Sequence, residues 1–399
     1  MKYADKYLQT AISLLNVYDG AMPLAAFLKN YFAQHKKYGS KDRKYIAQLC
    51  YTYFRLGHAA KSFSKEDAVI TALFLCNEEA GIWSGLFPEQ WISHWEPELN
   101  KRIQYVLSVF PQFDIQQIFP FKLLLSEGID YSAFNQSHLT QPDLFLRIRP
   151  KKHNQVANTL IRAAIPFKQL TDSALALPNA TKLEGLLAID RDVIIQDYSS
   201  QRIAGFFEEI SARGPLSVWD CCAASGGKSI LAKDFFENIR LTVSDVRASI
   251  LHNLDERFQR AGIKDYQKTV RDLGHALSPV DKNNKVEKYD LIICDAPCSG
   301  SGTWGRTPEQ LFFFEAEKAD DFRKLQEKII LNVLPAMKEN GYLLYITCSA
   351  FKNENEYMTD FIQQQVPCRL VKQSLIAGYK QKADTMYAAL FQRKQETGN

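Results

Sequence analysis

The spacing of apolar positions changes along this chain. Over the first hundred residues they recur at helical spacing, as in YLQTAISLL, PLAAFLKNYFAQH and DRKYIAQLCYTYFRL. From about residue 101, LFLRIRP alternates like a strand, HNQVANTLIRAA has helical spacing, and IPFKQL and LLAI resume strand character. The pattern predicts a helical N-terminal domain over residues 1–100 and a small α+β module over residues 101–195.

After Gly214-Pro215, strand-like runs alternate with helical segments as far as the end of the chain. The expected strands are LSVWDCC, LTVSD, KTVRD, YDLIICD, GYLLYITC and TMYAALF. Such alternation predicts an α/β domain with a doubly wound sheet over residues 196–399. Tyr289 to Cys294 is nearly uncharged, which indicates a strand buried on both faces of a parallel sheet.

The composition is that of a globular protein. Of the 399 residues, 46% are hydrophobic and 24% charged, and no apolar stretch reaches the length of about 18 residues that a membrane span needs. The start, MKYADKYLQT, lacks the layout of a signal peptide, so we expect a cytoplasmic protein whose eight cysteines are reduced. No cysteine or histidine grouping has zinc-ligand spacing, and the sequence therefore implies no metal.

The net charge of +4 permits nucleic acid binding without requiring it. Two groups of basic residues are candidates for contacts with RNA phosphates. The first group lies in the helical domain and the second in the small module: Lys36, Lys37, Lys41, Arg43, Lys44 and Arg55, then Arg147, Arg149, Lys151, Lys152 and Lys168. A solvated helix face is the commoner explanation of the first group, and a charged, exposed sheet edge also explains the second.

A loop of small residues, DCCAASGGKS over 220–229, joins the first strand of the C-terminal domain to a helix. It matches neither the dinucleotide fingerprint nor the phosphate-binding loop, which needs glycine where this chain has Cys222. Small residues let a ligand approach the backbone, and the helix amides bind a negative group, so a smaller nucleoside ligand is indicated. Asp245 would accept hydrogen bonds from ribose hydroxyls and Asp272 from an adenine amino group, although each could simply cap a helix.

Chemically reactive side chains follow the fourth and fifth expected strands. Asp295 and Cys298 come after YDLIIC, and Cys348 ends GYLLYITC. If these strands are neighbours, their carboxyl ends bring both thiols and the acid to one cleft, which suggests covalent catalysis. Taken singly, Asp295 or Cys298 is equally well a turn cap or a small buried side chain.

These motifs resemble the RsmB-like RNA cytosine-5 methyltransferases. The resemblance rests on DCCAASGGKS, SDVRASILHNLDERFQRAGI, Asp272, DAPCSGSGTWGRTPE and YITCS, and it is strong over about 195–394. It implies a class I methyltransferase sheet that binds S-adenosylmethionine, preceded by helical and small α+β RNA-binding extensions. By the resemblance, Cys348 attacks carbon 6 of cytosine, Cys298 assists removal of the carbon 5 proton, and Asp295 binds the base. The implied cofactor residues are Cys222, Ala223, Ala224, Ser225, Gly226, Gly227, Lys228, Asp245, Asp272 and Asp295.

The resemblance thus predicts an enzyme that forms 5-methylcytosine in RNA, foremost in 16S ribosomal RNA. The sequence says nothing of the oligomeric state, and our default expectation is a monomer. Two alternatives stay open: a tRNA or DNA cytosine-5 methyltransferase in which Cys298 is the nucleophile, and a non-catalytic RNA-binding ribosome-assembly factor. The chain departs from the family at Ser225, where proline is usual, and at Ile250, where arginine is common.

Overall fold

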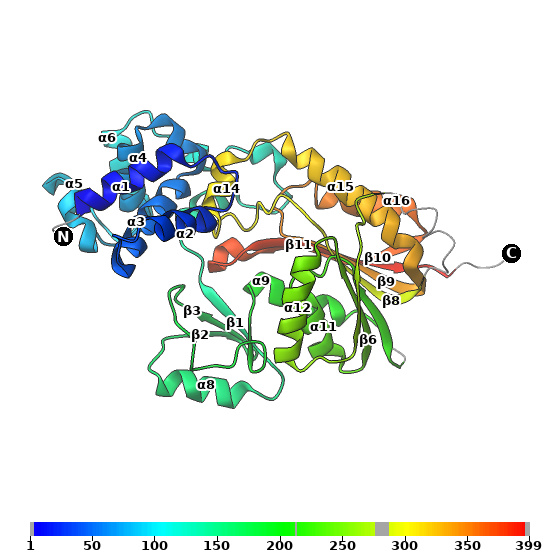
Figure 1. Cartoon of the computed structure of the whole chain (residues 1–399). Helices are drawn as coiled ribbons and strands as arrows, with labels where there is room; N and C mark the ends of the chain where they lie inside the picture. Colours follow the sequence, from blue (N-terminus) through cyan, green and yellow to red (C-terminus); the bar gives the residue numbers. More distant parts are fainter. Residues whose placement is uncertain (1–3, 212–213, 276–286, 396–399) are drawn as a thin grey trace. The chain divides into compact units, whose positions relative to one another are not determined.

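The computed structural model describes residues 4–211, 214–275 and 287–395, whose helices and strands fall into two units (Figure 1). The helical unit comprises residues 1–123, 130–142 and 303–316. The sheet unit comprises residues 124–129, 143–302 and 317–399.

The helical unit is built from short amphipathic helices, as the apolar spacing predicts. Its α-helices are α1 (Ala4–Val17), α2 (Leu24–Gln34), α3 (Ser40–Arg55), α4 (Lys65–Cys76), α5 (Glu89–Ser93), α6 (Leu99–Val109), α7 (Tyr131–Ser137) and α14 (Pro308–Phe313). In α3, for example, Ile46, Leu49 and Tyr53 lie three and four residues apart and are all buried. None of the described helices combines the length and the apolar character that a membrane crossing demands.

Residues 303–316, which we expected in the methyltransferase domain, belong to the helical unit. Within this unit, Glu309 Oε1 accepts a hydrogen bond from the Leu24 amide at 3.2 Å, and the Leu311 carbonyl lies 3.0 Å from Nε2 of His58. The rings of Phe54 and Phe312 pack edge to face with centroids 5.3 Å apart. The helical unit also includes residues 101–123 and 130–142, so its limits differ from the boundaries that we expected; the three-domain division itself stays a prediction.

The small module forms a four-stranded sheet within the sheet unit. Its elements are β1 (Leu144–Ile148), α8 (His153–Arg162), β2 (Lys168–Thr171), β3 (Ala174–Leu177) and β4 (Val193–Ile195), with strand order β2-β3-β1-β4. The helix covers one face of the sheet, with Val156 and Leu160 packed on Leu146 and Leu175. The expected strand LLAI was wrong, because those residues form a turn in which Ile189 makes one isolated bridge to Val193.

The main sheet has seven strands in the order β10-β11-β9-β8-β5-β6-β7. The strands are β5 (Leu216–Asp220), β6 (Ile239–Asp245), β7 (Tyr266–Val270), β8 (Tyr289–Asp295), β9 (Met337–Thr347), β10 (Cys368–Ala377) and β11 (Thr385–Arg393). Strands β5 to β9 are parallel, whereas β11 runs antiparallel to β9 and to β10. All six predicted strands are present and the doubly wound fold is confirmed; β10 was missed because its charged and polar residues break the apolar pattern.

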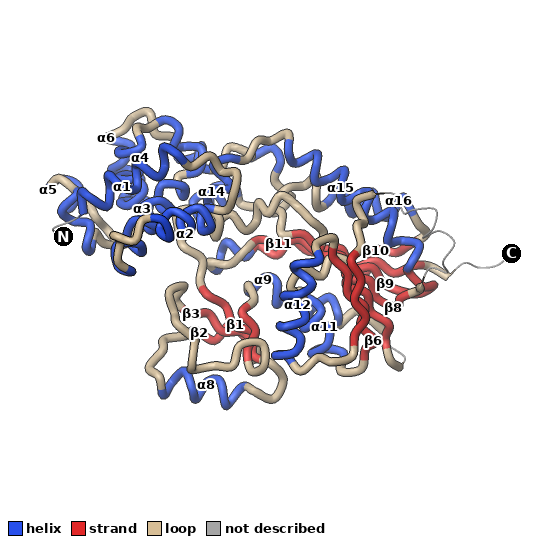
Figure 2. The backbone as a smooth tube through the Cα atoms, in the orientation of Figure 1, coloured by secondary structure: helices blue, strands red, loops and turns tan. Residues whose placement is uncertain are grey.

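Two hydrophobic cores lie on the two faces of this sheet, and both are lined by helices (Figure 2). One core includes residues of α11 (Gly227–Phe236) and α12 (Ala248–Ala261), and the other includes residues of α15 (Lys318–Val333) and α16 (Glu356–Gln365). Strand β8 sends alternate side chains into each core, Leu291 to the first and Ile292 to the second. It is buried on both faces, as predicted, and its carboxyl end lies between those of β5 and β9.

Candidate active site

A cavity of about 800 Å³ opens at the carboxyl ends of the parallel strands. It is lined by seven of the predicted site residues: Cys222, Ala224, Asp245, Asp272, Asp295, Cys298 and Cys348. Strands β6, β7 and β8 therefore deliver the predicted acids, and the ends of the neighbouring strands β8 and β9 deliver the two thiols, to one place.

Sequence reasoning missed most of the remaining wall of this cavity. The additional lining residues are Cys221, Val246, Arg247, Arg271, Leu273, Gly274, His275, Ala296, Pro297, Leu325, Lys328 and Ile329. Most of them directly follow a predicted strand end, and that position was the signal that could have found them. Leu325, Lys328 and Ile329 come from α15 and gave no comparable signal, because only the packing of that helix brings them to the cavity.

The loop between β5 and α11 has a backbone that only small residues permit. Ala224 and Gly226 both have left-handed φ angles, +46° and +82°, and the Gly226 amide donates to the Ala223 carbonyl at 2.8 Å. A Cβ atom on Gly226 would lie 2.4 Å from a ring carbon of Phe258. The loop leads directly into the N-terminus of α11, whose first amides favour a negative group.

The acids that end β6 and follow β7 combine local hydrogen bonds with a position on the cavity wall. Asp245 accepts hydrogen bonds from the Ala224 amide at 3.0 Å and from the Arg247 amide at 3.0 Å. Asp272 accepts from the Gly274 amide and from His275, and these bonds lower the pKa of Asp272. Asp245 and Asp272 therefore each cap a turn and also line the cavity. Small residues, a helix N-terminus and two carboxylates fit a nucleoside that carries a charged amino-acid chain.

Other predicted cofactor residues do not line the cavity. Ala223 is buried and donates its amide to the Ser244 carbonyl, and Ser225 bonds to Arg257. The Nζ of Lys228 is 2.9 Å from Asp295 Oδ2 and 2.8 Å from the hydroxyl of Ser200. The buried Lys228 therefore holds the Asp295 carboxylate, and the cofactor roles of Ala223, Ser225, Gly226, Gly227 and Lys228 stay predictions.

The two thiols are in direct contact. The sulfur atoms of Cys298 and Cys348 are 3.1 Å apart, and this hydrogen bond, together with burial, raises the pKa of the Cys298 thiol. The loop after Cys298 is bonded to the end of β9, because the Gly302 amide donates to the Cys348 carbonyl at 2.9 Å. The backbone thus fixes the two thiols relative to each other.

Glu354 binds the residue that follows each thiol. Its buried carboxylate accepts from the Ser299 amide at 2.8 Å, from the Ser299 hydroxyl at 2.5 Å and from the Ser349 hydroxyl at 2.6 Å. Gln326 donates to the same carboxylate at 3.0 Å and to the Pro297 carbonyl at 2.9 Å. Burial raises the pKa of Glu354 and these donors oppose that effect. No sequence pattern drew attention to this residue.

Gly302→Ala is expected to destabilise the protein. A Cβ atom there would lie 1.9 Å from the Thr385 carbonyl oxygen, which is backbone and cannot turn away. We expect the free energy of unfolding, measured by urea titration, to fall by at least about 2 kcal/mol. Gly205→Ala in α10 (Ala204–Phe207) is the control: its added methyl group meets open space, so its stability should be unchanged or slightly higher. Equal stability of the two variants would contradict the expectation.

Asp220, which ends β5, gives the protein a predictable dependence of stability on pH. It is fully buried, and burial is the main factor that raises its pKa to about 7, against about 3.9 in an unfolded chain. Between these values the folded state keeps a proton that the unfolded state has lost. The contribution of Asp220 to the free energy of unfolding should therefore fall as pH rises from about 4 to 7, by up to about 4 kcal/mol, and then level off.

The measurement is urea unfolding at several pH values for the wild type and for Asp220→Asn. The amide keeps an acceptor for the hydroxyl of Ser229, which now bonds to Asp220 at 2.6 Å, but it cannot ionise. Asp220→Asn should therefore lack this decline, and its stability relative to the wild type should be greatest at pH 7 and above. Asp321→Asn, on the exposed surface of α15, should keep the wild-type profile. Parallel profiles for all three proteins would show that Asp220 does not titrate as expected.

Three thiols lie together at the ends of β5 and β8, beside the cavity. Among the described residues, Cys221, Cys222 and Cys294 form the one group in which three potential metal ligands come within 4.8 Å of one another. The sequence gave no sign of it, because two adjacent strands supply the cysteines. Three thiols are one ligand fewer than a structural zinc site uses, and two of them, Cys221 and Cys222, line the cavity.

The prediction of an RNA-binding face on the small module is wrong in part. Arg147 is buried, and its Nη1 is 2.5 Å from Asp234 Oδ2; Arg149 Nη2 is 2.7 Å from Oδ1 of the same carboxylate. Both arginines thus bind α11 instead of pointing outward, because two cations beside one buried acid are more stable paired than free. In the helical unit Arg55 is likewise buried, donating to the carbonyls of His138 and Thr140. The exposed lysines remain candidates for RNA contacts: Lys36, Lys37, Lys41, Lys44, Lys151 and Lys168.

The fold and the cavity define the class of protein. The strand order, the small-residue loop and the acids at the strand ends are those of an S-adenosylmethionine-dependent methyltransferase. Solved structures share this fold: "Crystal Structure of PH0851" has a TM-score of 0.69 at 19% identity, covering 96% of this chain and 97% of that one. A methyltransferase homologue from Pyrococcus horikoshii has a TM-score of 0.55 at 16% identity, covering 67% of this chain and 92% of that one.

Comparisons of the sequence narrow the kind of methyltransferase further than the fold does. Residues 213–397, somewhat less than half of the chain, match the family model described as "16S rRNA methyltransferase RsmB/F". A relative from Xanthomonas campestris, "Ribosomal RNA small subunit methyltransferase B", is 29% identical over 207 residues, which are 49% of this chain and 44% of the relative. A Bacillus subtilis relative, "Probable ribosomal RNA small subunit methyltransferase B", is 28% identical over 57% of this chain and 51% of its own length. The matched part thus spans about half the length of these relatives.

Proposed function

We propose that this protein transfers a methyl group from S-adenosylmethionine to carbon 5 of a cytosine in RNA, foremost in the RNA of the small ribosomal subunit. The observation that carries the proposal is the pair of sulfur atoms 3.1 Å apart, Cys298 and Cys348, on the wall of the cavity that Asp295 also lines. The family match and the names of the relatives support ribosomal RNA as the substrate.

The chemistry requires a nucleophile on the protein, because carbon 5 of cytosine is itself a weak one. In the proposed reaction the thiolate of Cys348 bonds to carbon 6, and the ring electron pair moves to carbon 5. S-adenosylmethionine, when bound, supplies a methyl group on a positively charged sulfur. Loss of the carbon 5 proton then re-forms the ring double bond, and the bonding electrons of the carbon–sulfur bond return to Cys348.

The pairing of the thiols supports these two roles. The hydrogen bond to Cys348 and burial both raise the pKa of Cys298. Cys298 therefore keeps its proton in the free enzyme, and Cys348 is the sulfur available for attack. Once Cys348 is bonded to carbon 6 it carries no charge, so Cys298 ionises more readily and can help to remove the carbon 5 proton.

Asp295 is suited to bind the polar edge of the base. Its side chain is about one-third exposed, and the buried Lys228 holds Oδ2 at 2.9 Å. A carboxylate fixed in this way accepts hydrogen bonds from the amino group and from the ring nitrogen that gains a proton as the adduct forms. Because the base must enter a cavity, we propose a single-stranded or flipped nucleotide as the target.

The test supplies the purified protein with tritium-labelled S-adenosylmethionine and with small-subunit RNA, transfer RNA or DNA. Label in RNA, and 5-methylcytidine in its nucleoside digest by mass spectrometry, is the expected result. Label in transfer RNA alone or in DNA alone would replace the substrate, and a different methylated nucleoside would refute the cytosine chemistry. No label in any nucleic acid, from protein that binds S-adenosylmethionine, would favour a non-catalytic RNA-binding factor.

A further inference from the structure

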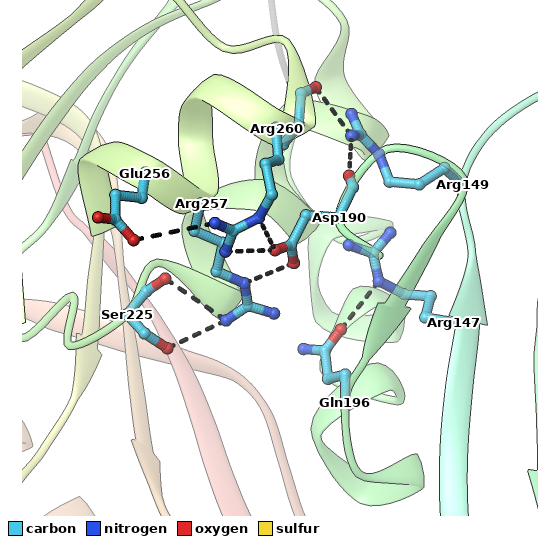
Figure 3. A network of polar contacts seen from close by, with 9 residues as sticks. Arg147, Arg149, Asp190, Gln196, Ser225, Glu256, Arg257 and Arg260 are labelled. Atoms are coloured by element: carbon cyan, nitrogen blue, oxygen red, sulfur yellow. Dashed lines mark hydrogen bonds and ion pairs between the residues drawn. The ribbon is translucent and has the colours of Figure 1, made fainter. Parts of the chain in front are cut away.

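We propose that Arg257 is a positioning residue for the cofactor loop, and that it acts through Ser225. Arg257 lies on α12, whose buried residues Leu254 and Phe258 anchor that helix to the sheet. Its Nη1 donates to the Ser225 hydroxyl at 3.0 Å and to the Ser225 carbonyl at 3.4 Å (Figure 3). One guanidinium group therefore holds both the side chain and the backbone of this loop residue.

Ser225 is the position at which such a contact has the greatest effect. It lies between Ala224 and Gly226, whose φ angles of +46° and +82° are both left-handed. Left-handed backbone is uncommon outside glycine and persists where surrounding contacts fix it. Serine has no ring to restrict its own backbone, so the loop depends on hydrogen bonds from outside it. The Ala224 amide bonds to Asp245 on one side, and Arg257 supplies the contact on the other.

Arg257 is itself held by the small module. Its Nε donates at 2.8 Å to Asp190, a buried acid in the turn before β4. The other oxygen of Asp190 accepts from Arg260 at 3.0 Å, and Arg149 donates to the Asp190 carbonyl at 2.8 Å. Figure 3 shows Asp190 at the centre of these three arginines, with Ser225 at the far end of Arg257. The planar guanidinium can bind an acid and a hydroxyl together, and this fixes its direction.

The consequence concerns the binding of S-adenosylmethionine. Without Arg257 the loop samples conformations in which its amides and small residues do not match the ligand, and the ligand must select the matching one. The affinity then falls although no group that lines the cavity has been removed, because neither Ser225 nor Arg257 is among the lining residues. The inference does not depend on the cytosine chemistry, so it can hold even if the proposed reaction fails.

The experiment is a double-mutant cycle on the dissociation constant of S-adenosylmethionine, measured by calorimetry. We expect Arg257→Ala to weaken binding about tenfold, which corresponds to one charge-assisted hydrogen bond. Ser225→Ala leaves the weaker contact to its carbonyl and should weaken binding about threefold. Because both changes remove the same contact, the double variant should equal Arg257→Ala alone, at about tenfold.

Arg260→Ala is the matched control. Arg260 lies three residues further along the same helix and binds the same Asp190, but the structure gives it no bond to Ser225. Its loss should leave the affinity for S-adenosylmethionine unchanged. A purely structural role predicts otherwise: both arginine variants would weaken binding alike, and the effects of Ser225→Ala and Arg257→Ala would multiply to about thirtyfold. Either outcome would overturn the proposal.

Thermal unfolding of every variant separates loss of fold from loss of loop geometry. If Arg257→Ala does not fold, Arg257→Lys takes its place, because lysine keeps a charge for Asp190 but lacks the second group that reaches Ser225. A folded Arg257→Lys protein with wild-type affinity would also refute the role assigned to Arg257.

Discussion

Cys348→Ala is expected to abolish methyl transfer while leaving the binding of S-adenosylmethionine intact. Without this sulfur, carbon 6 of cytosine has no nucleophile, and carbon 5 is not activated toward the methyl group. We expect the transfer rate, measured as tritium incorporated into RNA, to fall about 10⁴-fold or more. The dissociation constant of S-adenosylmethionine should change little, because Cys348 contributes one small side chain at the margin of the cavity.

Cys298→Ala should give a different result, and the comparison assigns the two thiols. Cys348 can still attack, but the step that removes the carbon 5 proton and frees the enzyme is impaired. A covalent protein–RNA adduct should therefore accumulate, visible as a band of reduced mobility that survives denaturing electrophoresis and disappears after nuclease treatment. An adduct in Cys348→Ala and none in Cys298→Ala would reverse the assignment and make Cys298 the nucleophile. The 3.1 Å between the sulfur atoms is why exchange of their roles must be tested.

The parts of the site that the sequence predicted correctly depend on strand ends. An apolar run that ends in an acid or a thiol fixes which residue emerges at the edge of a parallel sheet, so Asp245, Asp295 and Cys348 could be placed at the cavity from their positions alone. The adjacency of β8 and β9 was a condition of that reasoning, and the sheet order satisfies it.

The wrong predictions concern long charged side chains, which can either point into solvent or bind a partner that is distant in the sequence. Arg147 and Arg149 alternate with apolar residues in the run LFLRIRP, a pattern typical of an outward face, yet both turn toward Asp234 of α11. Their partner is 85 or more residues away in the chain, so periodicity alone could not reveal it. Arg257 and Ser225 are 32 residues apart and were missed for the same reason.

The contacts in the structure change the interpretation of the two positions, 225 and 250, at which the chain departs from the family pattern. Serine at position 225 is expected to loosen the cofactor loop relative to proline, but its hydroxyl gives Arg257 a partner that proline could not offer. Arginine is absent at position 250, yet Arg247, three residues earlier, lines the cavity and bonds to Asp245. A cationic group is therefore present at this corner of the cavity without one at position 250.

Glu354→Gln should slow methyl transfer by about 10- to 100-fold without weakening the binding of S-adenosylmethionine. Four donors converge on the Glu354 carboxylate, and two of them, the amide and the hydroxyl of Ser299, belong to the residue that follows Cys298. A third is the hydroxyl of Ser349, which follows Cys348. Glutamine has the same shape, but its NH₂ group must face at least one of these donors, so the loops that hold the thiols would separate.

Glu356→Gln is the control for this variant, because it alters a second, partly buried acid of the same segment. Glu356 accepts from the Ser126 hydroxyl at 3.0 Å and from the Glu127 amide at 3.2 Å, and within the part of the chain that the structure describes it bonds to neither thiol loop. Both variants should lose similar stability in urea titration, since each replaces a carboxylate that binds backbone and hydroxyl donors. Only Glu354→Gln should slow the formation of the RNA adduct in a Cys298→Ala background, where that step is isolated. Equal adduct rates in the two variants would mean that Glu354 supports the fold and does not position the thiols.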